Sequence, residues 1–151
     1  MPCTYCAWIF ILVYIYTSGG GGGGITGQAT YYTVYVPSKC YGFDQSPFPP
    51  GPLIAAASPD LYGNGAICGS SYAITCTGAA SGGSNPCTGN PTVTVKVVDL
   101  CPGCHQNSFD LSQQAFSKIA NLNAGRLTIT ARKVSGIGEE LEAAAEIVQF
   151  V

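Results

Sequence analysis

Six of the eight cysteines in this chain of 151 residues lie between positions 40 and 104, and this clustering constrains the fold more than any other feature. An even number of cysteines in a short exported chain predicts a disulfide framework, and six allow 15 pairings that spacing alone does not distinguish. We therefore expect a small stapled domain whose disulfides use Cys40, Cys68, Cys76, Cys87, Cys101 and Cys104.

The first 24 residues predict export. An uncharged apolar run extends from about Ala7 to Tyr16 and is shorter than the roughly 20 residues that a membrane span requires. A signal peptide is therefore favoured, although no Lys or Arg precedes the run and six glycines follow it; a retained signal anchor is the alternative. We expect residues 1–24 to be signal peptide and Gly-rich junction, 25–134 to be the domain, and 135–151 to be an acidic tail, weakly helical or disordered.

The charge balance argues against a nucleic-acid partner. Only 9% of the residues are charged, and the formal net charge is -2 at pH 7. Four of the eight acidic residues lie in the tail, which leaves six Lys and Arg against four acids in the rest of the chain. This balance predicts no nucleic-acid binding and is compatible with a neutral or weakly acidic polysaccharide.

Alternating apolar and polar residues predict an all-β domain. Strands are expected at 28–36, 53–57, 71–76, 92–99 and 126–133, with Leu127, Ile129 and Ala131 inward in the last. Asp60 to Gly65 is expected to form a helical turn or loop. Five or six short strands joined by Gly- and Pro-rich loops favour a small β-barrel.

One helix is expected, from Asp110 to Ala120, with Ser112 or Asp110 as its N-cap. In the strand before it, Val93, Val95 and Val97 share one face, and the alternation places Asp99 on that face too. A charge there is costly unless it is paired or faces a groove, which indicates a site.

Several motifs follow one another between residues 26 and 134: GQATYYTVYVPSKCYG, LIAAASPDLYGNGAICG, VVDLCPGC, FDLSQQAFSKI and RLTITARKV. Together they resemble the first domain of expansins and, more closely, the EG45-like domain proteins and plant natriuretic peptides. The resemblance implies a disulfide-stapled, six-stranded double-psi β-barrel with one or two short helices and a shallow polysaccharide-type groove. In such a barrel Cys40 and Cys68 are the favoured pair, because each flanks the opening loops.

The related family 45 glycoside hydrolases use two carboxylates, and an inverting glycosidase needs both an acid and a base. Their acid resembles Asp110, but the first strand, where their base lies, reads TYYTV from position 30 and has no carboxylate. We therefore expect no hydrolysis and no catalytic residue, or Asp110 alone if there is one. The groove that the resemblance implies comprises Thr30, Tyr32, Thr33, Asp99 and Asp110.

The resemblance implies a monomeric, non-enzymatic protein that is secreted to the apoplast and cell wall. The first hypothesis is a natriuretic peptide-type signalling and stress protein that affects water and ion homeostasis through a plasma-membrane receptor. The alternative is binding or loosening of cell-wall polysaccharide through the Asp99/Asp110 groove, and a second alternative is residual glycosidase or lytic activity. Ser108 replaces the histidine that precedes Phe-Asp in expansins, and 151 residues leave no room for a second binding domain, so loosening is disfavoured.

Simpler roles stay open for the same residues. Asp110 can cap the helix, and Asp99 can brace the turn after it, with or without a ligand. Cys101 and Cys104 could form a redox pair or bind zinc with His105, but the helix begins too far away and no second close pair completes a metal site. We expect no cofactor and no metal.

Overall fold

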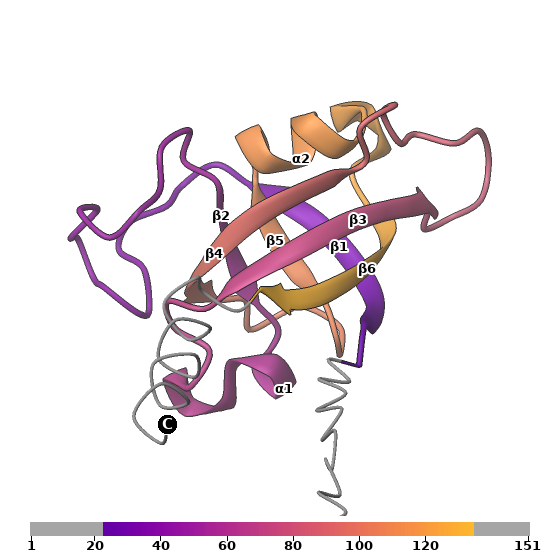
Figure 1. Cartoon of the computed structure of the whole chain (residues 1–151). Coiled ribbons are helices and arrows are strands. Elements are labelled where there is room, and N and C mark those ends of the chain that lie inside the picture. Colours follow the sequence, from indigo (N-terminus) through magenta and orange to yellow (C-terminus); the bar gives the residue numbers. More distant parts are fainter. Residues whose placement is uncertain (1–22, 135–151) are drawn as a thin grey trace, which may run out of the picture.

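A computed structural model describes residues 23–134, which form an all-β domain with short helices (Figure 1). The strands are β1 (Ile25–Tyr32), β2 (Ile54–Ala57), β3 (Ser71–Ala79), β4 (Thr92–Leu100), β5 (Phe109–Ser112) and β6 (Leu127–Val134). The helices are α1 (Pro59–Tyr62) and α2 (Gln113–Ile119), with 3-10 turns η1 (Gly63–Gly65) and η2 (Leu122–Ala124). The predicted signal peptide and acidic tail lie outside the described residues.

The strands pair in a closed order, β1-β5-β2-β4-β3-β6, with β6 antiparallel to β1. The β1–β5 and β2–β4 pairs are parallel, and the others are antiparallel. The short strands β2 and β5 therefore lie between longer ones, and residues distant in the sequence become neighbours. No helix among residues 23–134 is long and apolar enough to cross a membrane.

Alternate residues of the strands fill the interior, as a period of two requires. The valines at 93, 95 and 97 and the apolar residues at 127, 129 and 131 are buried in one cluster, which confirms the predicted inward faces. Helix α2 covers one end of the ring, and helix α1 lies at the opposite end (Figure 1). Phe116 of α2 packs against Tyr31 with ring centroids 4.9 Å apart.

The predicted helix start was wrong, because Asp110 belongs to strand β5 and the helix begins at Gln113. Ser112 is the N-cap, and its Oγ accepts a hydrogen bond from the backbone N–H of Ala115 at 3.2 Å. Locally, FDLS followed by an amphipathic run favours a helix start. These four residues form a strand because they pair in parallel with β1 and antiparallel with β2. The non-local pairing outweighs the local preference for a helix start.

Three disulfides staple the domain, as predicted. They join Cys40 to Cys68, Cys76 to Cys87 and Cys101 to Cys104, so the favoured Cys40–Cys68 pair is confirmed. The first holds the long loop between β1 and β2 against the segment before β3, and the second closes the loop between β3 and β4. The bridged Cys101–Cys104 pair leaves no free thiols in the turn after β4.

Candidate functional site

Both aspartates singled out in the sequence lie in one row that crosses four adjacent strands. Ala56 of β2 is the register partner of Asp99 in β4 on one side and of Asp110 in β5 on the other. Asp110 is in turn the partner of Thr30 in β1. Register partners point to the same face of a sheet, so these side chains line one surface, which we call the carboxylate row. The backbones of the two aspartates are two strand spacings apart, about 9.5 Å.

This row faces away from the core, since the residues flanking Ala56 and Asp110 in their strands belong to the buried cluster. Ala56 lies between the two carboxyl groups, is 3% exposed and has no side chain beyond its Cβ. Sequence reasoning did not single out this alanine, although the three small residues Ala55–Ala57 are a signal that could have found it. The structure therefore brings Asp99, Asp110 and Thr30 together around Ala56.

A β-bulge places Asp99 in the row. Ala55 pairs with Val97 but Ala56 pairs with Asp99, so Val98 is an extra residue in β4. One extra residue reverses the alternation beyond it. The expectation that Asp99 shares the face of Val93, Val95 and Val97 is thus corrected, because the bulge turns it away from the core. No charge has to be buried there.

Asp99 is held by backbone donors from two segments. Its Oδ1 accepts hydrogen bonds from the N–H of Lys39, at 2.7 Å, and from the N–H of Leu100, at 2.8 Å. The N–H of Cys40 donates to the carbonyl of the bulged Val98 at 3.1 Å. The bulge and Asp99 together dock the disulfide-bearing loop between β1 and β2 onto the end of β4, so Asp99 has a structural role at this position.

Asp110 has a different environment, with one short side-chain bond. The Thr30 hydroxyl donates to Oδ1 of Asp110 at 2.6 Å, across the parallel pairing of β1 and β5. Burial raises the pKa of the Asp110 carboxyl; the Thr30 hydroxyl opposes this rise, and the negative charge of Asp99 adds to it. A carboxyl group of raised pKa can donate or accept a proton, which suits either acid chemistry or hydrogen bonding to a neutral hydroxyl-rich ligand.

Tyr32 lies beside the row, two residues after Thr30 in the same strand. Its hydroxyl is buried and has no hydrogen-bond partner among the described residues. Burial, and after it the charges of Asp99 and Asp110, raises the pKa of this hydroxyl. Its ring meets that of Tyr35 edge-on at a centroid distance of 5.1 Å, whereas Tyr31 points into the core. The tyrosines are therefore split between core and surface, as expected.

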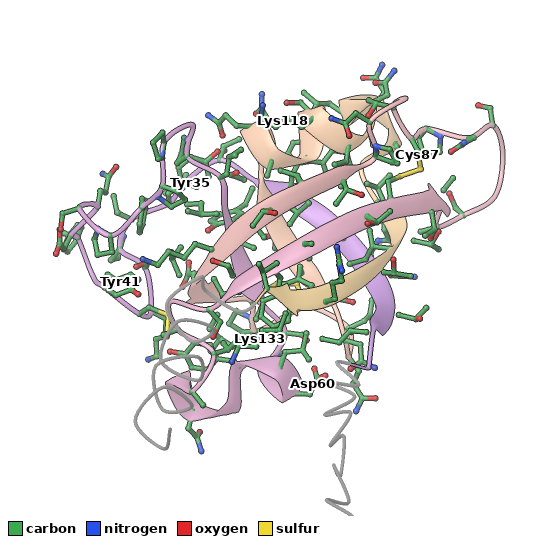
Figure 2. All side chains as sticks on the ribbon, in the orientation of Figure 1. Tyr35, Tyr41, Asp60, Cys87, Lys118 and Lys133 are labelled. Carbon is green, nitrogen blue, oxygen red and sulfur yellow. A yellow bond between two sulfur atoms is a disulfide. The ribbon has the colours of Figure 1, made fainter. Side chains whose placement is uncertain are left out.

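The remaining sequence-predicted residues are not joined to the row by any hydrogen bond of the described residues. Thr33 lies in the bend after β1 and is exposed, so its place in a groove stays a prediction. His105 is exposed in the loop between β4 and β5. Among residues 23–134 no group of three or more His, Cys, Asp or Glu side chains could hold a metal ion. Tyr35 was not predicted as a site residue; it extends from the β1–β2 loop and donates to Oε1 of Gln114 in α2 at 2.6 Å (Figure 2).

Comparison with known proteins finds relatives that share the EG45-like domain. Residues 54–131 match a family model described as lytic transglycolase. An EG45-like domain containing protein of Citrus jambhiri is 50% identical over 105 residues, which are 68% of this chain and 76% of the relative. EG45-like domain containing protein 1 of Arabidopsis thaliana is 40% identical over 119 residues, which are 79% of this chain and 89% of the relative.

Two solved structures are similar in fold. A variant of the Clavibacter michiganensis expansin in complex with cellohexaose is 26% identical, with a TM-score of 0.59. The match covers 74% of this chain and 50% of the expansin. The Streptomyces papain inhibitor is 27% identical, with a TM-score of 0.57, and the match covers 76% of this chain and 96% of the inhibitor.

Proposed function

The chain belongs to the family of EG45-like domain proteins, and on that premise we propose that it is a secreted, non-catalytic, expansin-like domain that binds polysaccharide along the carboxylate row. The observation that carries the proposal is the alignment of Asp99, Ala56, Asp110 and Thr30 on one outward face. An extended sugar chain can lie across this face and form hydrogen bonds with the carboxyl and hydroxyl groups. The solved expansin that holds cellohexaose supports this ligand class. In this proposal the closed ring of strands is the double-psi barrel that the resemblance implies.

The lack of catalysis is proposed from the roles of the two carboxylates. An inverting glycosidase needs a base that activates water opposite the acid. One oxygen of Asp99 already accepts hydrogen bonds from two backbone N–H groups. Strand β1 contributes a threonine and a tyrosine to this face, and no carboxylate. Asp110 is then the single candidate for acid chemistry. We propose that it binds a sugar hydroxyl instead of cleaving the chain.

The test measures binding of cellohexaose by calorimetry to the purified, oxidised protein. Replacing Asp110 by Ala and Thr30 by Val should each weaken binding about tenfold, since each removes one or more hydrogen bonds of the row. Asp44→Ala is the matched control, because Asp44 is exposed and outside the row. Equal binding by all three variants would disprove the site. Shortening of the polysaccharide by the wild-type protein, abolished in Asp110→Asn, would disprove the lack of catalysis and favour a lytic reaction.

A second candidate is natriuretic peptide-type signalling in the apoplast, through a plasma-membrane receptor that contacts a surface other than the row. The match covers 89% of the Arabidopsis relative, so a single domain of this kind accounts for nearly the whole of that protein. The papain inhibitor, matched over 96% of its length, supports a role in which such a domain acts on another protein. Here the Asp110→Ala and Thr30→Val variants should keep their full effect on water uptake by plant cells. Loss of that effect in both would contradict this candidate.

A further inference from the structure

A small hollow lies beside the carboxylate row, on the side of β1 where Thr30 faces the loop between β4 and β5. Its volume is about 130 Å³, roughly ten times the space that one water molecule requires. Gln28 and Thr30 of β1, His105, the Cys101–Cys104 disulfide and Arg126 are among its lining residues. Segments from three parts of the chain thus meet around a space large enough for a carboxyl group and part of a sugar ring.

The polar groups at this hollow are mainly hydrogen-bond donors. Arg126 donates from Nη1 to Oε1 of Gln28 at 2.9 Å, and its other guanidinium N–H groups have no hydrogen-bond partner among residues 23–134. This bond uses the oxygen of the Gln28 amide, so the NH₂ group of that amide is left as a donor. Arg126 forms no ion pair within the described part of the chain. A guanidinium beside an amide donor is complementary to an acceptor-only anion, above all a carboxylate.

The hollow is continuous with the proposed binding row through one residue. Thr30 lines the hollow, and its hydroxyl donates to Asp110 in the row at 2.6 Å. The Cys101–Cys104 disulfide supplies apolar surface beside the donors. A ligand that fills both places therefore needs neutral hydroxyl groups at Asp110 and a negative group one step further along.

From this arrangement we infer that the hollow is a carboxylate subsite, and that the preferred ligand is a polysaccharide containing uronic acid residues. The inference rests on the proposed polysaccharide-binding function and specifies its substrate class. The uronate carboxylate accepts from Arg126 and from the Gln28 amide. The neighbouring sugar presents its hydroxyl groups to Thr30 and Asp110 and points any carboxylate of its own away, because a carboxylate facing Asp110 would be repelled.

The experiment compares a hexamer of galacturonic acid with its fully methyl-esterified form, which has the same sugar backbone and no charge. We expect the wild-type protein to bind the acid about ten- to hundredfold more tightly than the ester, as a charge-assisted pair allows. Arg126→Gln should remove this preference, and Arg126→Lys should restore part of it. Both changes leave the backbone bonds of residue 126, to Ala124 and Ala80, in place. Arg132→Gln is the matched control: Arg132 is an exposed arginine of β6 that does not line the hollow.

The outcomes separate the subsite from the row. Equal binding of acid and ester by the wild-type protein, with cellohexaose binding intact, would overturn the subsite and leave the proposed function standing. A preference for the acid that Arg132→Gln removes as strongly as Arg126→Gln would also overturn it, because binding would then follow net charge. A uronate ligand is supported if the preference for the acid over the ester is lost in Arg126→Gln. It is also supported if the wild-type protein keeps that preference when excess inorganic sulfate is added at constant ionic strength. Displacement of the hexamer by equimolar sulfate would overturn this ligand class.

Discussion

The two ends of the carboxylate row differ, although both carry an aspartate on the same face. At the β4 end, Asp99 accepts two backbone N–H bonds and holds a loop that is distant in the sequence. At the β5 end, Asp110 has one hydroxyl partner and a pKa raised by burial. A carboxylate used to satisfy backbone donors stabilises the fold, whereas one left partly desolvated retains capacity for a ligand. The difference predicts opposite effects of mutation at the two ends.

The largest expected effect comes from deleting Val98, the bulged residue of β4. Asp99 then directly follows Val97 and keeps the outward face, but the strand loses a fully buried side chain and the carbonyl that accepts the N–H of Cys40. Loss of this packing and of the loop contact should lower the free energy of unfolding by about 3–5 kcal/mol. Urea unfolding followed by circular dichroism measures this.

The control is deletion of Gly83 in the loop between β3 and β4, where no atom lies within 4 Å of the position that a Cβ would occupy. Shortening this exposed loop should change stability by less than about 1 kcal/mol. If deletion of Val98 is tolerated as well as deletion of Gly83, the bulge does not hold the loop between β1 and β2 on the end of β4.

The next effect in size is that of Asp99→Ala. Two backbone N–H groups lose their acceptor and are partly exposed, so we expect the free energy of unfolding to fall by about 1–2 kcal/mol. Asp44→Ala is the comparison: Asp44 also accepts a backbone N–H, from Ser46 at 2.9 Å, but on an exposed loop. A loss no greater than that of Asp44→Ala would show that Asp99 does not brace the loop.

Asp110→Asn should act in the opposite direction and slightly increase stability at pH 7, by less than about 1 kcal/mol. Asparagine keeps an acceptor for the Thr30 hydroxyl and removes a charge that burial disfavours. Because the folded-state pKa of Asp110 is raised, its stabilising contribution is complete below the unfolded value of about 3.9 and is lost as the pH rises through the folded value. Urea unfolding between pH 3 and pH 7 should therefore show that the free energy of unfolding of the variant increases relative to that of the wild type as the pH rises. A variant that loses stability relative to wild type over this range would contradict the assignment.

The smallest effect is a shift in one titration. Thr30→Val keeps the β-branched shape and removes the hydroxyl that lowers the pKa of Asp110, so this pKa should rise further. Carbon-13 NMR of the side-chain carboxyl groups measures it directly. Asp60 provides the internal reference. Desolvation is the largest single influence on its pKa and raises it, but the hydrogen bonds from Ser58, the Asn107 N–H and neighbouring backbone N–H groups together outweigh it and hold the pKa below the ordinary value. An Asp110 titration unchanged by Thr30→Val would show that the 2.6 Å bond does not form in solution.

Much of the fold follows from local pattern. The inward faces of β4 and β6 and the buried face of α2 were predictable, because alternation and helical spacing report directly on one-sided burial. The number of disulfides followed from the cysteine count, and Asp110 and Thr30 were singled out by resemblance. Strand β5 was not predictable from its four residues, since their local signals favour a helix start and their partners lie about 80 residues away in β1 and 50 in β2.

By itself the sequence determined the class of molecule: a small disulfide-stapled all-β domain with two aspartates around a CPGC turn. Only the tertiary structure decided what those aspartates do. The face of a strand residue is predicted by counting alternate positions along the sequence. A single bulge at Val98 reverses this alternation, so the local pattern could not place Asp99 on the face of Asp110. Likewise, Arg126 meets Gln28 only because β1 and β6 are adjacent in the closed strand order. The chemistry of the face depends on these long-range pairings, which are settled by packing the whole ring.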